Sequence, residues 1–134
     1  MSSENLGTIP VYKKALELCE ISRHIVSYIS FNKDLINLYQ SNSLRDIIAG
    51  SLLTDTILIP KKIEQAEYSE SYAVRIKNAS FINIMICNLN SYCTGLEKDG
   101  VKDKEYLQLL RKEIRSFRKT FKKWRGSLPN TSVD

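Results

Sequence analysis

Lys104-Glu-Tyr-Leu-Gln-Leu-Leu-Arg-Lys-Glu-Ile-Arg-Ser-Phe-Arg-Lys-Thr-Phe-Lys-Lys-Trp-Arg125 is the stretch of sequence that decides the fold of this chain. Its large apolar residues recur at steps of three and four, the spacing that places side chains on one face of an α-helix. The pattern predicts a long amphipathic helix that packs its apolar face against other helices. The residues of this apolar face are Leu107, Leu110, Ile114, Phe117, Phe121 and Trp124.

The same stretch carries a dense row of cations. Five of them repeat the steps of the apolar face one residue later, and because each residue turns a helix by about 100°, they flank that face. Eight lysines and arginines and one acid, Glu113, give this row a net charge of +7, whereas the whole chain carries +5. The basic character of the protein is therefore local to this helix. We call the eight cations the basic stripe: Arg111, Lys112, Arg115, Arg118, Lys119, Lys122, Lys123 and Arg125.

Phosphate is the ligand that the basic stripe favours. Cations near a helix C-terminus interact well with the helix dipole, which accounts for those from Lys122 onward. It does not account for Arg111, Lys112 and Arg115, which have no acid four residues before or after them, although a helix stabilised for its own sake usually interleaves glutamate with lysine. Because the planar guanidinium of arginine suits phosphate, we predict sequence-independent binding to RNA or DNA.

Other functions also fit a basic helix. The protein can be an oligomeric adaptor that binds an acidic protein partner and has no direct role with nucleic acid. It can also carry nothing more than a solvated basic surface, since a surplus of lysine and arginine is common. Peripheral attachment to an anionic membrane is the weakest of these, because the core needs the apolar face, and no membrane partner is predicted. No motif that reads bases is present, and the aromatic residues of this helix lie on its apolar face.

No pattern of catalytic or metal-binding residues is evident. His24 is the single histidine, and Cys19, five residues before it, falls on a different face of the same predicted helix. A nucleophile and its base must lie within hydrogen-bond reach of each other. Di-iron sites in helical bundles need more than one histidine, and no glycine-rich phosphate loop occurs. We therefore expect a protein that is not an enzyme and has neither metal nor cofactor.

Length and composition indicate a single helical domain. At 134 residues, with 43% hydrophobic and 26% charged residues, the chain resembles ordinary globular domains. Only five glycines and three prolines interrupt it, which favours long helices with short connections. The sequence pI of about 9.1 is compatible with an anionic partner.

The cysteines and the N-terminal sequence indicate a cytoplasmic protein. Cys19, Cys87 and Cys93 are odd in number and form no C-x-x-C pair, so neither a disulfide framework nor a zinc site is predicted. We expect all three to be small buried hydrophobic residues in a reducing compartment. The first residues lack the basic and apolar regions of a signal peptide, and no apolar run reaches the length of a membrane span.

The hydrophobic periodicity predicts four long helices and no strand. We expect helices over residues 10–31, 44–67 and 71–98 and a last one that begins near residues 102–104, with an irregular or short helical connection over 35–42. The fold class is all-α, an antiparallel up-down four-helix bundle. The predicted regions are a disordered lead-in over residues 1–9, the bundle over 10–126 and a disordered tail over 127–134.

The predicted helix over residues 44–67 has two special features. It is apolar almost all round, which suggests burial on several sides, and we expect the excess to form a subunit interface. Pro60 interrupts its hydrogen bonding, so we expect a kink there rather than a helix that stops at Ile59 and restarts. Ser43 and Asp46 form an acidic variant of the capping box at its start. The predicted interface residues are Ile47, Leu52, Ile57 and Leu58.

Four segments carry a likeness to a known family. They are Val11-Tyr12-Lys13-Lys14-Ala15-Leu16-Glu17-Leu18, Leu44-Arg45-Asp46, Ile59-Pro60 followed by Ile63, and Tyr106-Leu107. Over residues 11–124 the chain resembles the bacterial four-helix-bundle proteins named after the intervening sequences of 23S ribosomal RNA genes. These are related in fold to the accessory proteins of diversity-generating retroelements. The chain departs from the family at residues 59–66, where members often read Ile-Pro-x-Asn-Ile-Ala-Glu-Gly, and at residues 79–84, where Gly-Ser-Leu-x-Glu-Leu is typical.

The resemblance implies an assembly and partners. Members of the family form ring-shaped homo-oligomers, pentamers in the known examples, and have no firmly established enzymatic activity. For the retroelement relatives, a basic surface engages nucleic acid and a reverse transcriptase. By resemblance we therefore expect a pentameric ring that multiplies the basic stripe, and the acidic protein partner of the adaptor alternative could be a reverse transcriptase.

Overall fold

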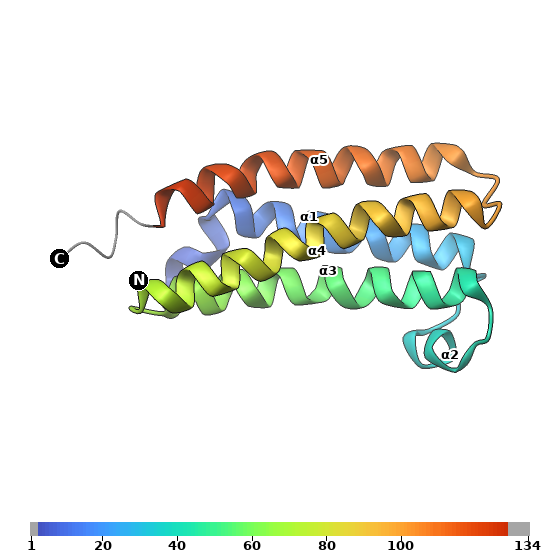
Figure 1. The fold of residues 1–134 in the computed structure, drawn as a ribbon, viewed down its shortest axis with the longest axis horizontal. Helices are drawn as coiled ribbons and strands as arrows, with labels where there is room; N and C mark the ends of the chain where they lie inside the picture. Colours follow the sequence, from blue (N-terminus) through green and yellow to red (C-terminus); the bar gives the residue numbers. More distant parts are fainter. Residues whose placement is uncertain (1–2, 129–134) are drawn as a thin grey trace.

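The computed structural model describes residues 3–128 of the 134-residue chain. All regular structure within this range is helical, and five α-helices, four of them long, follow one 3-10 helix without a strand (Figure 1). This confirms the all-α class. The elements are η1 (Ser3–Thr8), α1 (Pro10–Ile29), α2 (Leu35–Gln40), α3 (Leu44–Tyr68), α4 (Tyr72–Lys98) and α5 (Lys104–Ser127).

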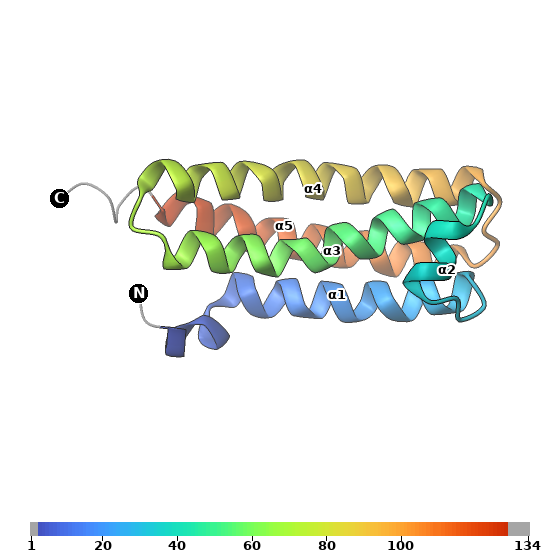
Figure 2. The same cartoon turned by 90° about the horizontal axis from the view of Figure 1, so that it is seen from below.

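The four long helices lie along the long axis of the molecule, and α2 projects at one end (Figures 1 and 2). α1 and α4 each pack against both α3 and α5, whereas α2 packs against α3. The start of α1 and the end of α5 lie at the same end of the molecule, opposite α2 (Figure 1). The helices therefore enclose one core that runs along the length of the molecule.

The chain is ordered earlier than the sequence suggested. Residues 3–8, expected within a disordered lead-in, form η1, which packs on α1 and α3 and buries Leu6. The apolar Leu6 side chain packs against the helices and holds this segment in place. The sequence did not predict this contact, because the residues around Leu6 are mostly polar. At the other end, α5 includes Ser127, and Leu128 is buried, so these two residues of the predicted tail are ordered. Residues 1–2 and 129–134 lie outside the described residues.

The core is built from one apolar face of each long helix. All six residues of the apolar face of α5 are buried, and so are Val11, Ala15, Leu18, Ser22, Ile25 and Ile29 of α1. On α4 the buried residues Ala79, Ile82, Ile86, Leu89, Cys93 and Leu96 recur at the same steps, whereas Tyr72 is exposed. Phe117 and Phe121 are the largest fully buried side chains. The steps of three and four therefore identify the buried side of each helix.

Pro60 lies inside a continuous α3, so the alternative of a helix that ends at Ile59 does not occur. Proline has no backbone N–H, and the carbonyl four residues earlier loses its helical partner. That carbonyl belongs to Thr56, and the Cys19 thiol of α1 donates a hydrogen bond to it at 2.8 Å. Burial raises the pKa of Cys19, which keeps the thiol protonated and able to donate. A side chain of α1 thus replaces the hydrogen bond that α3 lacks.

A short connection joins α1 to α3 through α2. Asp34 caps α2 by accepting a hydrogen bond from the Asn37 backbone N–H at 2.9 Å. Tyr39 of α2 lies over Gly50 of α3, where an added Cβ would meet its ring at 3.3 Å, and its hydroxyl bonds to Thr54. The small residue at position 50 therefore lets α2 lie flat against α3.

Asp46 anchors the start of α3. Ser43 caps the helix as predicted, accepting a hydrogen bond from the Asp46 backbone N–H. The Asp46 side chain does not close the predicted capping box. It is 2% exposed and instead accepts hydrogen bonds from Lys33 and Ser41, while the Ser41 hydroxyl accepts from the Ser43 N–H. Burial by itself raises the pKa of Asp46, but these hydrogen bonds outweigh it and the pKa is lowered.

Candidate nucleic-acid interface

Three sets of contacts set the orientation of α5. Its apolar face is buried in the core. On one flank of that face Tyr106 packs against Tyr28 of α1, with ring centroids 4.6 Å apart. Near the other end, the Trp124 indole N–H donates to Glu67 of α3 at 2.8 Å. The rotation of α5 about its own axis is therefore fixed, and so is the direction in which the basic stripe points.

Arg111 differs from the rest of the basic stripe. Its guanidinium is half-buried and donates to the Glu97 carboxylate of α4 at 2.7 and 3.0 Å, and to the Thr94 hydroxyl at 3.0 Å. This arginine therefore joins α5 to α4, and most of its hydrogen-bonding capacity is used inside the protein. The acids of the same helix give no sign of this partner, because Glu97 lies 14 residues earlier on another helix.

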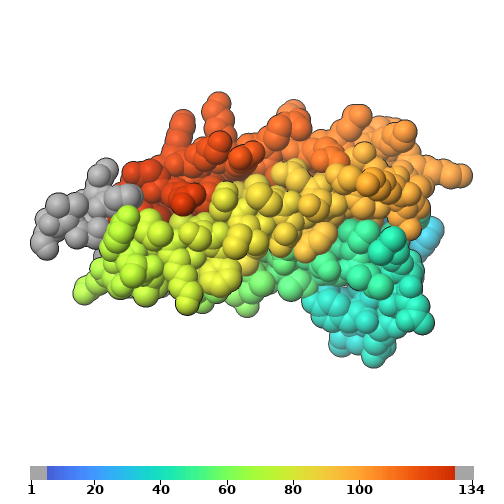
Figure 3. Space-filling model, viewed as in Figure 1, coloured from blue at the N-terminus to red at the C-terminus, as the bar shows by residue number. Residues whose placement is uncertain are grey.

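The other seven cations of the basic stripe are all exposed. None of them forms an ion pair with a carboxylate within residues 3–128. Side chains of α5 project from the edge of the molecule in Figure 3. The seven are Lys112, Arg115, Arg118, Lys119, Lys122, Lys123 and Arg125.

The single acid of the segment lies apart from these cations. At 100° per residue, Glu113 falls on the flank of the apolar face that also carries Tyr106, which is the flank toward α1. Arg111 falls on the opposite flank, toward α4. The seven exposed cations begin beside Arg111 and continue around the solvent side of the helix. They therefore form one continuous positive surface without an acid among them.

The residues predicted for a subunit interface differ in their exposure to solvent. Leu52 is 0% exposed, which places it in the core of the single chain and corrects its predicted role in the subunit interface. Packing against α1, α2 and α4 covers more of α3 than the sequence suggested. Ile47 and Ile57 are exposed, and Leu58 is half-buried against the core. These three remain available to another subunit.

The cysteines and the histidine lie in different surroundings. Cys19 and Cys93 are buried as expected, but Cys87 is exposed on α4, because five residues after the buried Ile82 the helix has turned it to the solvent side. His24 is exposed, 3.9 Å from Glu20. Within the described residues no three His, Cys, Asp or Glu side chains are grouped so that they could hold a metal ion.

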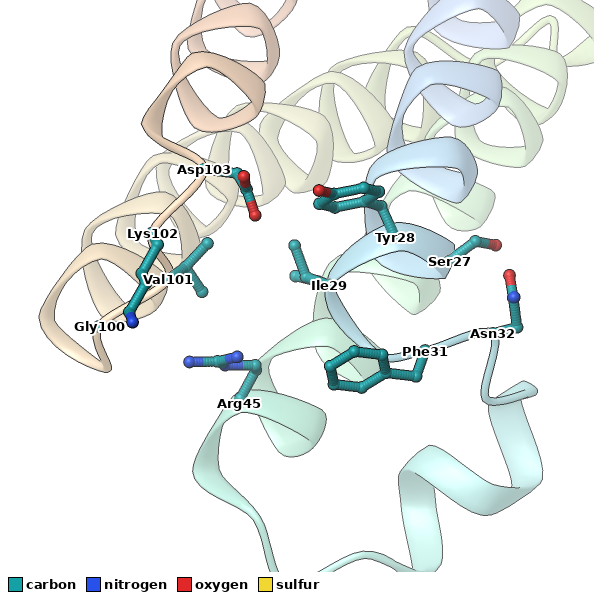
Figure 4. Close-up of a pocket in the computed structure, with 10 residues that line it drawn as sticks. All are labelled: Ser27, Tyr28, Ile29, Phe31, Asn32, Arg45, Gly100, Val101, Lys102 and Asp103. Atoms are coloured by element: carbon teal, nitrogen blue, oxygen red, sulfur yellow. The ribbon is translucent and has the colours of Figure 1, made fainter.

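A pocket that sequence reasoning did not find lies at the end of the molecule where α1 ends and α5 begins. Its volume is about 500 Å³. Figure 4 shows the rings of Tyr28 and Phe31 projecting from the end of α1 into this space, with Arg45 of α3 and the α4–α5 connection around it. Arg45 donates to the Asp99 carboxylate at 3.1 Å. The lining residues are Ser27, Tyr28, Ile29, Phe31, Asn32, Arg45, Gly100, Val101, Lys102 and Asp103.

The pocket lining combines exposed rings with charged groups of both signs. The negative charge of Asp103 is the main cause that raises the pKa of Tyr28. A second, mostly apolar pocket of about 440 Å³ continues along the groove between α1 and α5 and shares Tyr28. The sequence pattern gives no sign of the first pocket. It places Tyr28 away from the core, and only the structure shows that Tyr28 and Phe31 are exposed beside a cavity.

Comparison of the chain with models of protein families, with curated proteins and with solved structures gives no match. Among the helices of the described residues, none is long and apolar enough to cross a membrane.

Proposed function

We propose that this protein is a non-enzymatic, oligomeric helical protein that binds nucleic acid without regard to sequence, through the exposed cations of α5. The observation that carries this proposal is the set of seven exposed cations without an acidic partner in the described structure. A surface built for stability alone would pair cations with acids, as Arg111 is paired with Glu97. These cations are instead fixed on a rigid helix and left to solvent.

Phosphate is the ligand with the matching chemistry. A nucleic-acid backbone offers a regular row of single negative charges, and proteins that neutralise it release bound counterions. Because the cations are exposed, each individual contact is weak and is screened by salt over about 10 Å at 0.1 M. Binding through this surface therefore depends on many contacts made at once.

The proposal includes an antiparallel up-down arrangement of the four long helices, with α3 kinked at Pro60. The colour gradient of Figure 1 runs in opposite directions in successive long helices, and the α3–α4 and α4–α5 connections are short, as in such bundles. The hydrogen bond that Pro60 removes from α3 is the physical reason to expect a kink.

We further propose a homo-oligomer, for which the resemblance to the 23S intervening-sequence proteins suggests a pentameric ring. Exposed Ile47 and Ile57, with half-buried Leu58, supply an apolar surface on α3 that one chain leaves uncovered. A ring would present several copies of the basic stripe to one nucleic-acid strand. Linked copies raise the overall affinity without any new contact. A cytoplasmic location belongs to the same proposal.

Salt-dependent binding tests the proposed function. Fluorescence anisotropy with a labelled 20-base-pair DNA duplex and an RNA duplex of equal length gives the affinity at several salt concentrations. We expect the logarithm of the affinity to fall linearly with the logarithm of salt. In the triple variant Arg115→Ala, Arg118→Ala and Lys122→Ala, the slope should decrease by about 2 to 3, roughly one for each lost phosphate contact.

A matched control separates the basic stripe from net charge. The triple variant Lys13→Ala, Lys61→Ala and Lys77→Ala removes three exposed lysines from α1, α3 and α4 and changes the net charge equally. Its salt slope should match that of the unmodified protein. Equal losses in both triple variants, or binding that ignores salt, would contradict the proposal. Capture of an acidic protein, with no affinity for either duplex, would favour the adaptor alternative instead.

A further inference from the structure

The end of α1 contains a strained residue. The Asn32 backbone N–H donates to the Ser27 carbonyl at 2.8 Å, the bond that closes a Schellman motif after a helix. In this motif the residue after the C-cap adopts the left-handed conformation, which glycine usually provides. Here that residue is Phe31, with a φ of 57°, and it is followed by Asn32, with a φ of 64°, a residue type that tolerates this conformation better. A left-handed conformation is unfavourable for a residue with a side chain, because its Cβ approaches the following carbonyl oxygen.

The same chain uses glycine at the equivalent position of another helix. After α4, the Val101 N–H donates to the Leu96 carbonyl at 3.2 Å, and Gly100 has a φ of 85°. Both motifs lie at the same end of the molecule, and both line the pocket. The turn after α4 therefore has glycine at the left-handed position, whereas the turn after α1 has a large aromatic residue there.

The Phe31 side chain makes little packing contact that could offset its strained backbone conformation. Its side chain is 84% exposed, more than any other large hydrophobic residue of the described structure. Strain that persists without a packing benefit points to a function for the side chain itself. That function belongs to the pocket, because the ring of Phe31 forms one of its walls (Figure 4).

The other walls indicate what the ring meets. Tyr28 contacts Tyr106 and also lines the pocket. The charge of Arg45 is already paired with Asp99, so Lys102 is the cation at the rim without an ion pair in the described structure. The rim also holds donors and acceptors on Ser27, Asn32 and Asp103. A planar aromatic group with a polar edge and one nearby negative charge fits this lining.

We propose that the pocket receives one unpaired nucleobase, which stacks on Phe31 and Tyr28 while Lys102 contacts the phosphate of the same nucleotide. The inference rests on the proposed function and adds to it a preference for single strands. Stacking on aromatic rings tolerates every base, because each has a flat face. From Asp103 to Lys112 the helix rises about 14 Å, at 1.5 Å per residue. A short single strand that leaves the pocket therefore reaches the basic stripe.

The variant Phe31→Gly tests the proposal without endangering the fold. Glycine suits the left-handed position, so thermal unfolding should show equal or greater stability. Anisotropy with a labelled 12-nucleotide single-stranded DNA and with a 12-base-pair duplex then measures both binding modes. We expect single-strand affinity to fall about 5- to 100-fold, the effect of losing one stacked base, while duplex affinity changes less than about twofold. Phe31→Tyr should retain single-strand binding.

Two further variants complete the experiment. Phe81→Ala removes another exposed ring, which lies on α4 beneath the Lys62 ammonium, and should leave both affinities unchanged. Lys102→Ala should weaken single-strand binding more than duplex binding. The proposal is overturned, with the proposed function intact, if Phe31→Gly binds both probes like the unmodified protein. It is also overturned if that variant loses both equally, or if it dissociates the oligomer, which would make a second copy the occupant. Failure of the unmodified protein to bind either probe overturns both proposals.

Discussion

Single residues on α1 show how the core handles polar groups. The buried Ser22 hydroxyl has no hydrogen-bond partner among the described residues, whereas the buried Ser30 hydroxyl donates to the Val26 carbonyl at 2.6 Å. An unpaired buried hydroxyl costs about 1–3 kcal/mol of desolvation, while a typical hydrogen bond contributes about 1 kcal/mol. Ser22 within α1 and Ser30 at its C-terminal cap therefore have opposite effects on stability.

The first prediction follows from this contrast. Ser22→Ala removes the unpaired group and should raise the free energy of unfolding by about 1 kcal/mol, or leave it unchanged where relaxation has already reduced the cost. Ser30→Ala removes a formed hydrogen bond and should lower it by about 1 kcal/mol. Urea denaturation followed by circular dichroism measures both. A clear loss of stability in Ser22→Ala would show that its hydroxyl has a partner.

The second prediction concerns the thiol that replaces the hydrogen bond missing at Pro60. Cys19→Ala leaves the Thr56 carbonyl without its donor and should destabilise the protein by about 1–3 kcal/mol. In a Pro60→Ala background the restored backbone N–H supplies that carbonyl, so the same change should cost about 1 kcal/mol less. A double-mutant cycle by urea denaturation gives this coupling energy. Cys93→Ala is the control and should cost the same in both backgrounds; additive effects of Cys19→Ala would contradict the assignment.

At the scale of elements, the connection between α1 and α3 depends on one carboxylate. The pKa of Asp46 is lowered in the folded protein, so the charged form contributes stability above the ordinary value near 3.8. That contribution is lost as the pH falls through the lowered folded pKa. Lys33 and Ser41 then hold a neutral group, and the start of α3 is less firmly tied to the segment before it.

The third prediction tests this connection. Asp46→Asn should lower the free energy of unfolding at pH 7 by about 1 kcal/mol or more, because it weakens a buried charge-assisted hydrogen bond. The difference from the unmodified protein should shrink as the pH falls below about 3.8. Urea midpoints between pH 7 and pH 3 measure it. Glu70→Gln, at an exposed acid, should show no such trend, and a difference that stays constant with pH would contradict the role of Asp46.

Elements are also the scale at which sequence reasoning succeeds and then reaches its limit. Steps of three and four identify the buried faces of α1, α4 and α5, because burial of an apolar stripe follows from helix geometry alone. Contacts between helices cannot be predicted in this way. The ion pair of Arg111 with Glu97 and the burial of Leu52 depend on which helices become neighbours. The left-handed turn at Phe31 contradicts its residue type, so no local preference predicts it.

At the scale of the whole molecule, exposed apolar residues lie on α3 and exposed cations on α5. This separation predicts self-association through α3. Within residues 3–128, Ile47 and Ile57 of α3 are exposed, while the exposed cations lie on the solvent side of α5, which packs mainly against α1 and α4. An assembly through α3 therefore leaves the basic stripe free. The two proposed functions of the surface do not compete for the same residues.

The fourth prediction follows. Light scattering should give a mass that is a multiple of the 15.4 kDa chain. The double variant Ile47→Glu and Ile57→Glu places charges on the proposed interface and should yield monomers with an unchanged circular dichroism spectrum. Leu109→Glu, at an exposed position in the groove between α1 and α5, is the control and should keep the assembly. A monomeric unmodified protein would remove the proposal of a ring.

The shared position of the two ends of the described chain has a practical consequence for attachment. Because α1 begins and α5 finishes at the end of the molecule opposite α2 (Figure 1), a tether fixed near either end holds the protein upright. On a sensor chip, the Phe31 pocket would then face away from the solid support, toward flowing analyte. Immobilisation through one end and then through the other should therefore give matching binding traces.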